Sequence, residues 1–283
     1  MSGIIGDDTR AVAEEMEEEL GLPVVAVPTS GFLDDESFDG YLSVARVLTD
    51  RFMQPPARTR QGTVAFLGDY GGLYSAYVQE LKRLLAGIGL QLTVQFPTYT
   101  PLDEIQAVPE AELIILLGRR ADDEKQMQLA ELAEHIHAQF GTPYLADVYA
   151  VGAEETIRWL RRVGQLCHRE EAAERAIAAE EAAFAVTVEK VRADLAGRRC
   201  ALAIGRDLTW FQPEIILHLL KKAGVLLTGI VLLDSFLPER RAVMEEELRR
   251  RTDASIHYEG DVAAENVLHA ADFVLTTHEL GDA

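Results

Sequence analysis

The stretch Gly62–Phe96, GTVAFLGDYGGLYSAYVQELKRLLAGIGLQLTVQF, predicts the fold. Thr63–Leu67 is an apolar, β-capable run, and a turn rich in glycine and aspartate follows it. Apolar residues then recur at helical spacing from Tyr74 to Leu85, and Leu92–Phe96 is a second β-capable run. Parts in this order form a βαβ unit, which places two parallel strands side by side.

The same order of parts recurs in Cys200–Leu233, CALAIGRDLTWFQPEIILHLLKKAGVLLTGIVLL, and further apolar runs extend both units. We expect two sets of four strands: Thr63–Leu67, Leu92–Phe96, Leu113–Leu117 and Pro143–Ala146, then Cys200–Ile204, Leu226–Leu233, Ser255–Tyr258 and Phe273–Thr276. Near-continuous apolar strands are typical of parallel sheets covered on both faces. The predicted fold class is α/β, with repeated Rossmann-like, doubly wound parallel-sheet domains. Their ligands should bind at the carboxyl ends of the strands.

The predicted division of the chain has four parts. Residues 1–57 indicate the remnant of a first Rossmann-like domain, with a helix at Asp7–Leu20 that Gly21 ends, a strand at Val24–Val27 and a helix from about Glu36 to Phe52. Asp7 or Asp8 is the expected N-cap of the first helix. Residues 58–152 form a second such domain, with a short helix at Leu102–Ala107, while 153–197 form a helical connector and 198–283 a third domain. One strand cannot pair alone, and the last domain stops after its fourth strand, so we expect both terminal domains to be incomplete.

The composition restricts the partners. The 283 residues carry a formal net charge of −20, which argues against binding to nucleic acid or anionic membranes. The chain has no apolar run long enough to span a bilayer and does not begin with a signal peptide, so we expect a cytoplasmic protein. Two cysteines, Cys167 and Cys200, are too few for a disulfide scaffold.

The common catalytic and cofactor motifs are missing. The GDYGG turn is not a dinucleotide fingerprint, and Phe96 and Pro97 stand where an acidic residue would follow the next strand. The turn remains open to two interpretations, a tight βα connection or a pocket wall. His135 and His137 are two residues apart on a predicted helix and therefore point to different faces, which argues against metal chelation. Catalytic residues cannot be assigned, and no metal ligand is predicted.

Several segments in this order resemble nitrogenase component 1 and its relatives. The segments are "SGIIGDD", "VVAVPTSGF", "FLGDYGG", "IGLQLTVQFPTYTPLDEIQAVPEAELIILLGRR", "FGTPYL", "LAGRRCALAIGRD" and "AADFVLTTHELGD". The family includes molybdenum–iron protein subunits, cofactor-scaffold proteins and dark-operative protochlorophyllide reductase subunits. The resemblance implies three Rossmann-like domains, pairing with a second component 1-like subunit, and electrons from an ATP-dependent iron–sulfur reductase.

The resemblance also implies an iron–sulfur cluster or metallocofactor at a subunit interface. The first-domain cysteines of the family would lie ahead of Met1, and the histidine that ligates the cofactor would lie beyond the carboxyl end. At the position of the cofactor-ligating cysteine this chain has Gly118, which has no side chain. We therefore expect this chain alone to hold no cofactor.

What remains of the cofactor pocket in this resemblance is its lining. Tyr70, Arg120, Gly205 and Arg206 match positions around the cofactor, and we take them as candidate binding residues. Arginines and helix N-termini suit an anionic ligand. Two functions follow: a subunit of an oxidoreductase or metallocofactor-scaffold complex, or a non-catalytic binding or structural subunit that pairs with a cluster-bearing partner.

Overall fold

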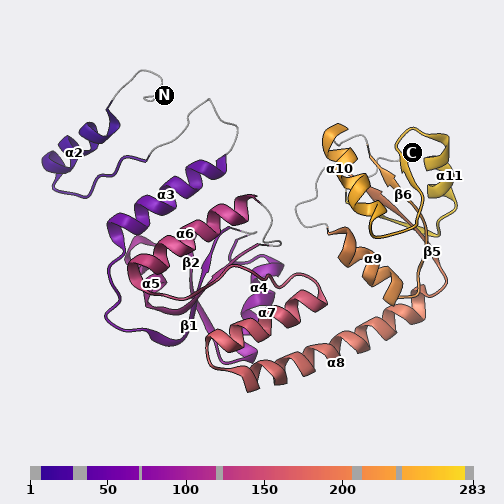
Figure 1. Cartoon of the computed structure of the whole chain (residues 1–283), viewed down its shortest axis with the longest axis horizontal. Helices are drawn as coiled ribbons and strands as arrows, with labels where there is room; N and C mark the ends of the chain where they lie inside the picture. The colour runs from indigo at the N-terminus through magenta and orange to yellow at the C-terminus, as the bar shows by residue number, and fades with distance from the viewer. Residues whose placement is uncertain are drawn as a thin grey trace. The chain divides into compact units, whose positions relative to one another are not determined.

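The computed structural model of the chain describes residues 8–27, 37–69, 72–118, 124–205, 212–233 and 238–277. The chain divides into two compact units, Met1–Ala178 and Ala179–Ala283, and each contains one parallel sheet (Figure 1). The boundary lies within the long helix α8, Glu170–Leu195. No helix among these residues is long and apolar enough to cross a bilayer.

The first sheet has four parallel strands covered on both faces. Their order across the sheet is β2 (Gln91–Phe96), β1 (Arg60–Leu67), β3 (Ala111–Leu116) and β4 (Tyr144–Leu145). One face packs against α4 (Ala76–Gly87), α7 (Ala153–Leu166) and the start of α8. The other face packs against α3 (Ser37–Phe52), α5 (Ala107–Glu110) and α6 (Glu124–Phe140).

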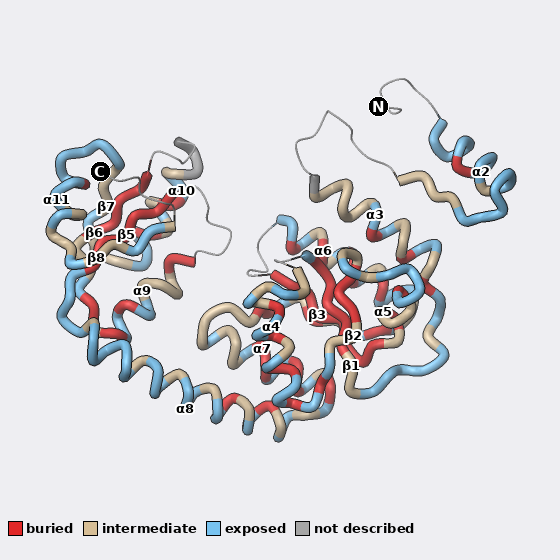
Figure 2. The backbone as a smooth tube through the Cα atoms, turned by 180° about the vertical axis from the view of Figure 1, so that it is seen from behind, coloured by how far each residue is buried: buried red, intermediate tan, exposed pale blue. Residues whose placement is uncertain are grey.

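The second half of strand β1, Val64–Leu67, is apolar because both faces of the sheet are covered there. Successive side chains of a strand point to opposite faces of the sheet. Val64 and Phe66 are buried beneath α4, whereas Ala65 and Leu67 are buried on the face of α3, α5 and α6. Since both faces are covered here, each of these four positions needs an apolar side chain, and Figure 2 shows the strands of this sheet as buried along most of their length.

The second sheet is covered unequally. Its order is β7 (Ile256–Tyr258), β6 (Leu226–Leu232), β5 (Arg199–Ile204) and β8 (Phe273–Thr276). One face packs against α9 (Pro213–Lys222) and α10 (Pro238–Arg249), and the other against α11 (Val262–His269). This distribution follows from right-handed crossovers, because a helix changes face when the chain reverses its direction across the sheet.

The α/β fold class and the two parallel sheets predicted from the sequence are confirmed, but the two sheets are not copies of each other. Numbered from the first strand of each unit, the orders are 2-1-3-4 in the first and 3-2-1-4 in the second. The first matches the first four strands of the flavodoxin-like order, and the second matches the first four strands of the Rossmann order. The strand order therefore reverses between β1 and β3 in one unit and between β5 and β8 in the other.

Two local predictions need correction. Val24–Val27 is not a strand, because no other described segment pairs with it. The short helix expected at Leu102–Ala107 is instead a 3-10 turn, Leu102–Glu104, followed by α5. Helix α2, Thr9–Leu20, ends at Leu20 as predicted, and one of the two expected residues, Asp8, is its N-cap. The Asp8 carboxylate accepts hydrogen bonds from the N–H groups of Arg10 and Ala11, and Gly21 ends the helix with φ of 63°.

Candidate functional site

The carboxyl edge of the first sheet brings three strand ends together. The Leu117 N–H donates to the Leu67 carbonyl at 2.8 Å, and the Gly68 N–H donates to the Phe96 carbonyl at 2.9 Å. A Cβ on Gly68 would lie 3.3 Å from Leu129 Cδ1, and the φ of Gly68 is 116°. Only glycine fits that conformation without strain, so Gly68 permits the close approach of β1, β2 and β3 at the point where the fold places ligands.

Gly118 follows β3 at this edge and is held from two sides. The Tyr77 hydroxyl of α4 donates to the Gly118 carbonyl at 2.8 Å. From α6, the buried Gln126 side chain covers the position where a side chain on residue 118 would begin. A Cβ at that position would overlap the carboxamide, with even Nε2 at only 2.8 Å. The end of β3 therefore presents an amide contributed by another element instead of a side chain of its own.

A second buried glutamine lies at the end of β2. The Gln95 Nε2 donates to the Gly68 carbonyl at 3.2 Å, and its side chain is fully buried. Its Oε1 has no hydrogen-bond partner among the described residues, which leaves a buried acceptor at this edge. Beyond it, Tyr99 adopts a left-handed backbone with φ of 62°, and a Cβ on Gly72 would lie 2.9 Å from its hydroxyl. Left-handed non-glycine residues concentrate at functional sites.

Tyr41 of α3 completes the described part of this edge. Its burial, together with the nearby Asp69 carboxylate, raises the pKa of the Tyr41 phenol above its ordinary value. Tyr41 therefore stays protonated at neutral pH and can donate a hydrogen bond. The described groups at the carboxyl edge include hydroxyls, carboxamides and the carboxylates of Asp69 and Asp147, a set that forms hydrogen bonds to a polar ligand.

Of the four candidate binding residues, the structure describes one. Tyr70, Arg120 and Arg206 lie outside the described residues. Gly205 follows β5 in the second unit, and its N–H donates to the Thr277 hydroxyl, which follows β8, at 2.7 Å. That bond bridges the two strands between which the order of the second sheet reverses.

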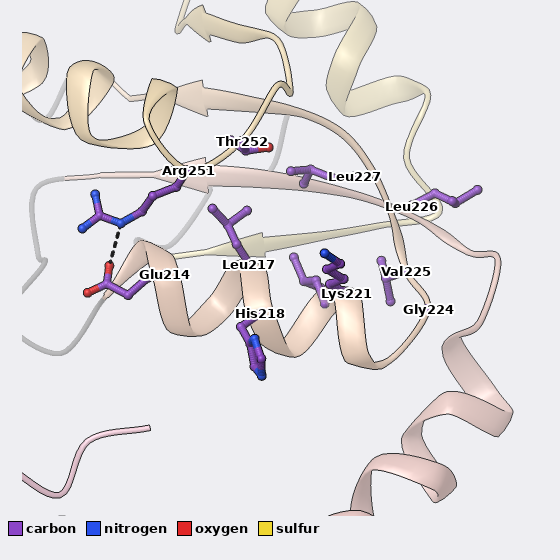
Figure 3. Close-up of a pocket in the computed structure, with 11 residues that line it drawn as sticks. Glu214, Leu217, His218, Lys221, Gly224, Val225, Leu226, Leu227, Arg251 and Thr252 are labelled. Atoms are coloured by element: carbon purple, nitrogen blue, oxygen red, sulfur yellow. Dashed lines mark ion pairs between the residues drawn. The ribbon is translucent and has the colours of Figure 1, made fainter. Parts of the chain in front are cut away.

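The second unit also has a groove, but at the opposite edge of its sheet. The groove has a volume of about 560 Å³ and lies between α9 and the amino ends of β6 and β7. Figure 3 shows Glu214 and Arg251 at one end of it, with 3.5 Å between the carboxylate oxygen and Arg251 Nε. Leu217, Val225 and Leu227 supply apolar walls. The Gly205 loop lies at the other, carboxyl edge of the sheet, which is where doubly wound folds bind ligands.

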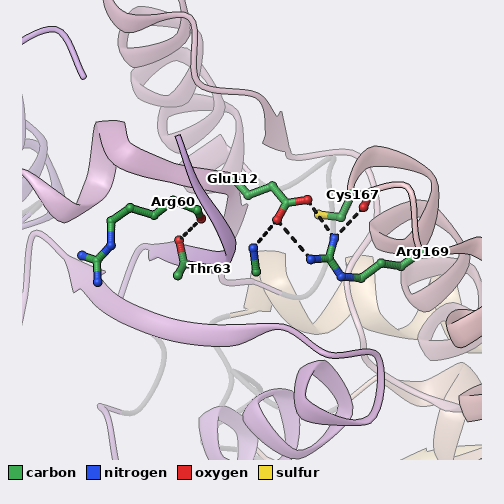
Figure 4. Close-up of polar contacts among 6 residues, drawn as sticks. Arg60, Thr63, Glu112, Cys167 and Arg169 are labelled. Atoms are coloured by element: carbon green, nitrogen blue, oxygen red, sulfur yellow. Dashed lines mark hydrogen bonds and ion pairs between the residues drawn. The ribbon is translucent and has the colours of Figure 1, made fainter. Parts of the chain in front are cut away.

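The cysteines are poor metal ligands. Cys167 lies beside Glu112 and Arg169 at the start of α8 (Figure 4), and burial together with the Glu112 carboxylate raises the pKa of the Cys167 thiol to about 12. Burial also raises the pKa of Cys200 in β5. The thiolate is the metal-binding form, and burial disfavours it at both cysteines.

The described residues do not fit an iron–sulfur cluster or metallocofactor. They contain no group of three or more histidine, cysteine, aspartate or glutamate side chains that could hold a metal ion. His135 pairs with Asp50 at 2.6 Å and His137 contacts the Thr142 carbonyl at 3.0 Å, so the two rings serve different contacts. At the carboxyl edge itself, residue 118 is a glycine whose side-chain position is filled.

Sequence reasoning missed the polar groups of the carboxyl edge, although one signal was available. Gln126, Leu129, Ala133 and Ile136 recur at helical spacing on the buried face of α6. A glutamine in that series indicates a polar side chain directed inward. Gln95 gives a similar signal, since it interrupts the apolar run of β2.

Comparison with known proteins agrees with the fold. A family model described as nitrogenase component 1 type oxidoreductase matches residues 1–279. The chain is 27% identical over 206 residues to a nitrogenase iron-molybdenum cofactor biosynthesis protein NifE from Clostridium pasteurianum, covering 72% of this chain and 43% of that protein. It is 26% identical over 215 residues to a nitrogenase molybdenum-iron protein alpha chain from Methanothermobacter marburgensis, covering 75% and 44%.

A solved structure described as nitrogenase Cp1 at pH 5 superposes with a TM-score of 0.59 at 17% identity. The match covers 96% of this chain and 59% of that one. Its low identity supports the fold alone. The chain spans less than half the length of the curated relatives named above. Because the family model extends over nearly the whole chain, the protein belongs to the nitrogenase component 1 type oxidoreductase family.

Proposed function

We propose that this chain is a component 1-like subunit of an oxidoreductase or metallocofactor-scaffold complex that receives electrons from an ATP-dependent iron–sulfur reductase. The family match over residues 1–279 carries this proposal. The two relatives, one named as a cofactor biosynthesis protein and the other as a molybdenum-iron protein alpha chain, leave both branches open. The partners of this chain are then a second component 1-like subunit and the reductase.

Within such a complex, this chain supplies a protein surface and a polar pocket, and the partner supplies the cluster. Gly118 has no donor atom, and Gln126 fills the space beside it. We assign no chemical step to a metal on this chain. Tyr70 and Arg120 in the first unit, and Gly205 and Arg206 in the second, remain candidates for contacting a ligand.

The test combines the full chain with a component 1-like subunit encoded beside it and a reduced iron–sulfur reductase. We expect a stable complex and oxidation of the reductase that needs MgATP and both subunits. The proposal is wrong if the chain forms no complex, or if omitting it leaves the rate of reductase oxidation unchanged.

The second candidate is a non-catalytic binding or structural subunit, and the filled position at Gly118 favours it. In the same experiment, this chain would join the complex and stabilise the partner, but electron transfer would proceed at the same rate with the partner alone. Measuring the melting temperature of the partner with and without the chain separates this outcome from a failure to bind.

A further inference from the structure

We infer that Gln126 is the residue that determines what the end of β3 can hold, because its carboxamide takes the place of a side chain on residue 118. Gly118 and Gln126 form a matched pair, and the wall of the carboxyl edge at this point is a neutral amide. The inference goes beyond the proposed function, since it depends on packing within this chain and holds whether or not the chain serves an electron-transfer complex.

The backbone conformation does not explain the glycine at position 118. The φ of Gly118 lies outside the left-handed region, unlike that of Gly68 or Gly72. An L-amino acid could adopt this backbone without strain. What excludes a side chain is the neighbouring carboxamide, since all three of the nearest atoms to a Cβ belong to Gln126.

The backbone at residue 118 is held in place, so the part that must move is the Gln126 carboxamide. Residue 118 is held by the Tyr77 hydroxyl at its carbonyl, and the preceding residue is held by the bond from the Leu117 N–H to the Leu67 carbonyl. Gln126 belongs to the same buried face of α6 as Leu129, which packs against Gly68, and its side chain is 1% exposed. To admit a side chain at residue 118, the carboxamide must leave this packed position.

The chemical consequence concerns the kind of ligand. A thiolate on a strand end is a soft metal ligand, whereas a carboxamide is a neutral hydrogen-bonding group with little affinity for soft metals. A ligand at this edge therefore meets hydrogen-bond donors and acceptors at the end of β3. Restoring a thiol at position 118 should create a metal-binding position only when Gln126 is shortened as well.

The test is a double-mutant cycle in the full chain, with Gly118→Ala and Gln126→Ala alone and combined. We expect Gly118→Ala to lower the melting temperature in the wild-type background and to leave it unchanged or raise it in the Gln126→Ala background. Gly40→Ala is the matched control, because a Cβ there meets nothing within 4 Å and its effect should be equal in both backgrounds. Equal effects of Gly118→Ala in the two backgrounds would overturn the inference.

If Gly118→Ala fails to fold, folding of the double variant supports the inference, and failure of the double variant while Gln126→Ala folds contradicts it.

A second readout uses Gly118→Cys with Cd²⁺ as the probe, measured by equilibrium dialysis. We expect the Gly118→Cys/Gln126→Ala variant to retain more Cd²⁺ per chain than Gly118→Cys, with the wild type as background for Cys167 and Cys200. Equal retention by the single and double variants, high or low, contradicts a selective role for Gln126.

Discussion

The two units open with the same βαβ unit and then diverge. In the first, the third strand crosses back to pair with β1, and in the second it continues outward to pair with β6. The reversal of strand order therefore lies beside β3 in one unit and beside β8 in the other. At the first reversal, Gln126 covers Gly118 and Leu129 packs beside Gly68, whereas at the second the Gly205 N–H bonds to the Thr277 hydroxyl. The two units therefore begin with similar sequences, but different contacts hold their strand ends together at the carboxyl edge.

At the amino edge of each sheet, a carboxylate accepts a backbone N–H and pairs with an arginine, but one pair is largely buried and the other is exposed. Glu112, near the start of β3, accepts the Gly62 N–H of β1 at 2.5 Å and binds Arg169 at 2.8 Å. Asp272, just before β8, accepts the Arg199 N–H of β5 at 2.7 Å and binds its guanidinium at 3.1 Å. We call these pairs the buried clamp and the exposed clamp. Since water screens an exposed ion pair, the clamps should differ in their contribution to stability.

The largest expected contrast concerns thiol reactivity. A pKa raised to about 12 leaves Cys167 with about a thousandfold less thiolate near pH 8 than an ordinary cysteine. We expect native Cys167 to react with a disulfide reagent far more slowly than in urea, and more slowly than Cys200. Mass spectrometry of the labelled peptides over time measures both. Rapid labelling of native Cys167 would contradict its buried position.

The sign of the linked pH effect follows from the same shift. A thiol whose folded-state pKa is raised contributes stability that is present below its unfolded pKa. That contribution is lost as the pH rises toward about 12. Urea unfolding between pH 8 and 11 should show a decline that Cys167→Ala reduces.

Breaking the buried clamp should have the next largest effect. Arg169→Ala leaves the Glu112 carboxylate, whose side chain is 9% exposed, without its cation. We expect a loss of about 3 kcal/mol in the free energy of unfolding of the first unit. Urea denaturation measures it. Arg161→Ala is the control, because the ion pair of Arg161 with Glu174 is exposed. An equal loss from Arg161→Ala would show that burial is not the cause.

Removing the bridge at the second carboxyl edge should have a smaller effect. Thr277→Val preserves the shape of the side chain but leaves the buried Gly205 N–H without its acceptor. We expect a loss of about 1–2 kcal/mol in the stability of the second unit. Thr187→Val, at an exposed threonine of α8, should be close to neutral in the same denaturation experiment. Similar losses for both variants would mean that the bridge is not what stabilises this edge.

The smallest expected effect is at the exposed clamp. The Arg199 N–H and guanidinium hold the pKa of Asp272 below its ordinary value. A lowered folded-state pKa contributes stability above the unfolded pKa, near pH 4, and that contribution disappears as the pH falls further. Asp272→Asn should therefore change stability slightly at pH 7 and not at all in strong acid. A change larger than that from Arg169→Ala would reverse the proposed order of the two clamps.

Periodicity predicted most elements because burial on two faces requires apolar residues along β1 and β5, and amphipathic spacing identifies helices such as α6. It could not predict the strand order, since the edge at which β3 or β7 joins depends on long-range packing. The strand expected at Val24–Val27 is wrong because a local propensity needs a partner. The family resemblance marks position 118 as one that lacks a ligating side chain. That Gln126 fills the space depends on how α6 packs against β3, which the sequence does not specify.

The most direct test of the account is the iron content of the purified chain. After anaerobic reconstitution with iron and sulfide and removal of unbound metal, we predict substoichiometric iron and no thiolate-to-iron absorbance for the wild-type chain. Its described cysteines are buried and residue 118 is a glycine covered by Gln126. A stable, stoichiometric cluster on the chain alone would contradict the central claim that this chain depends on a partner for its cluster.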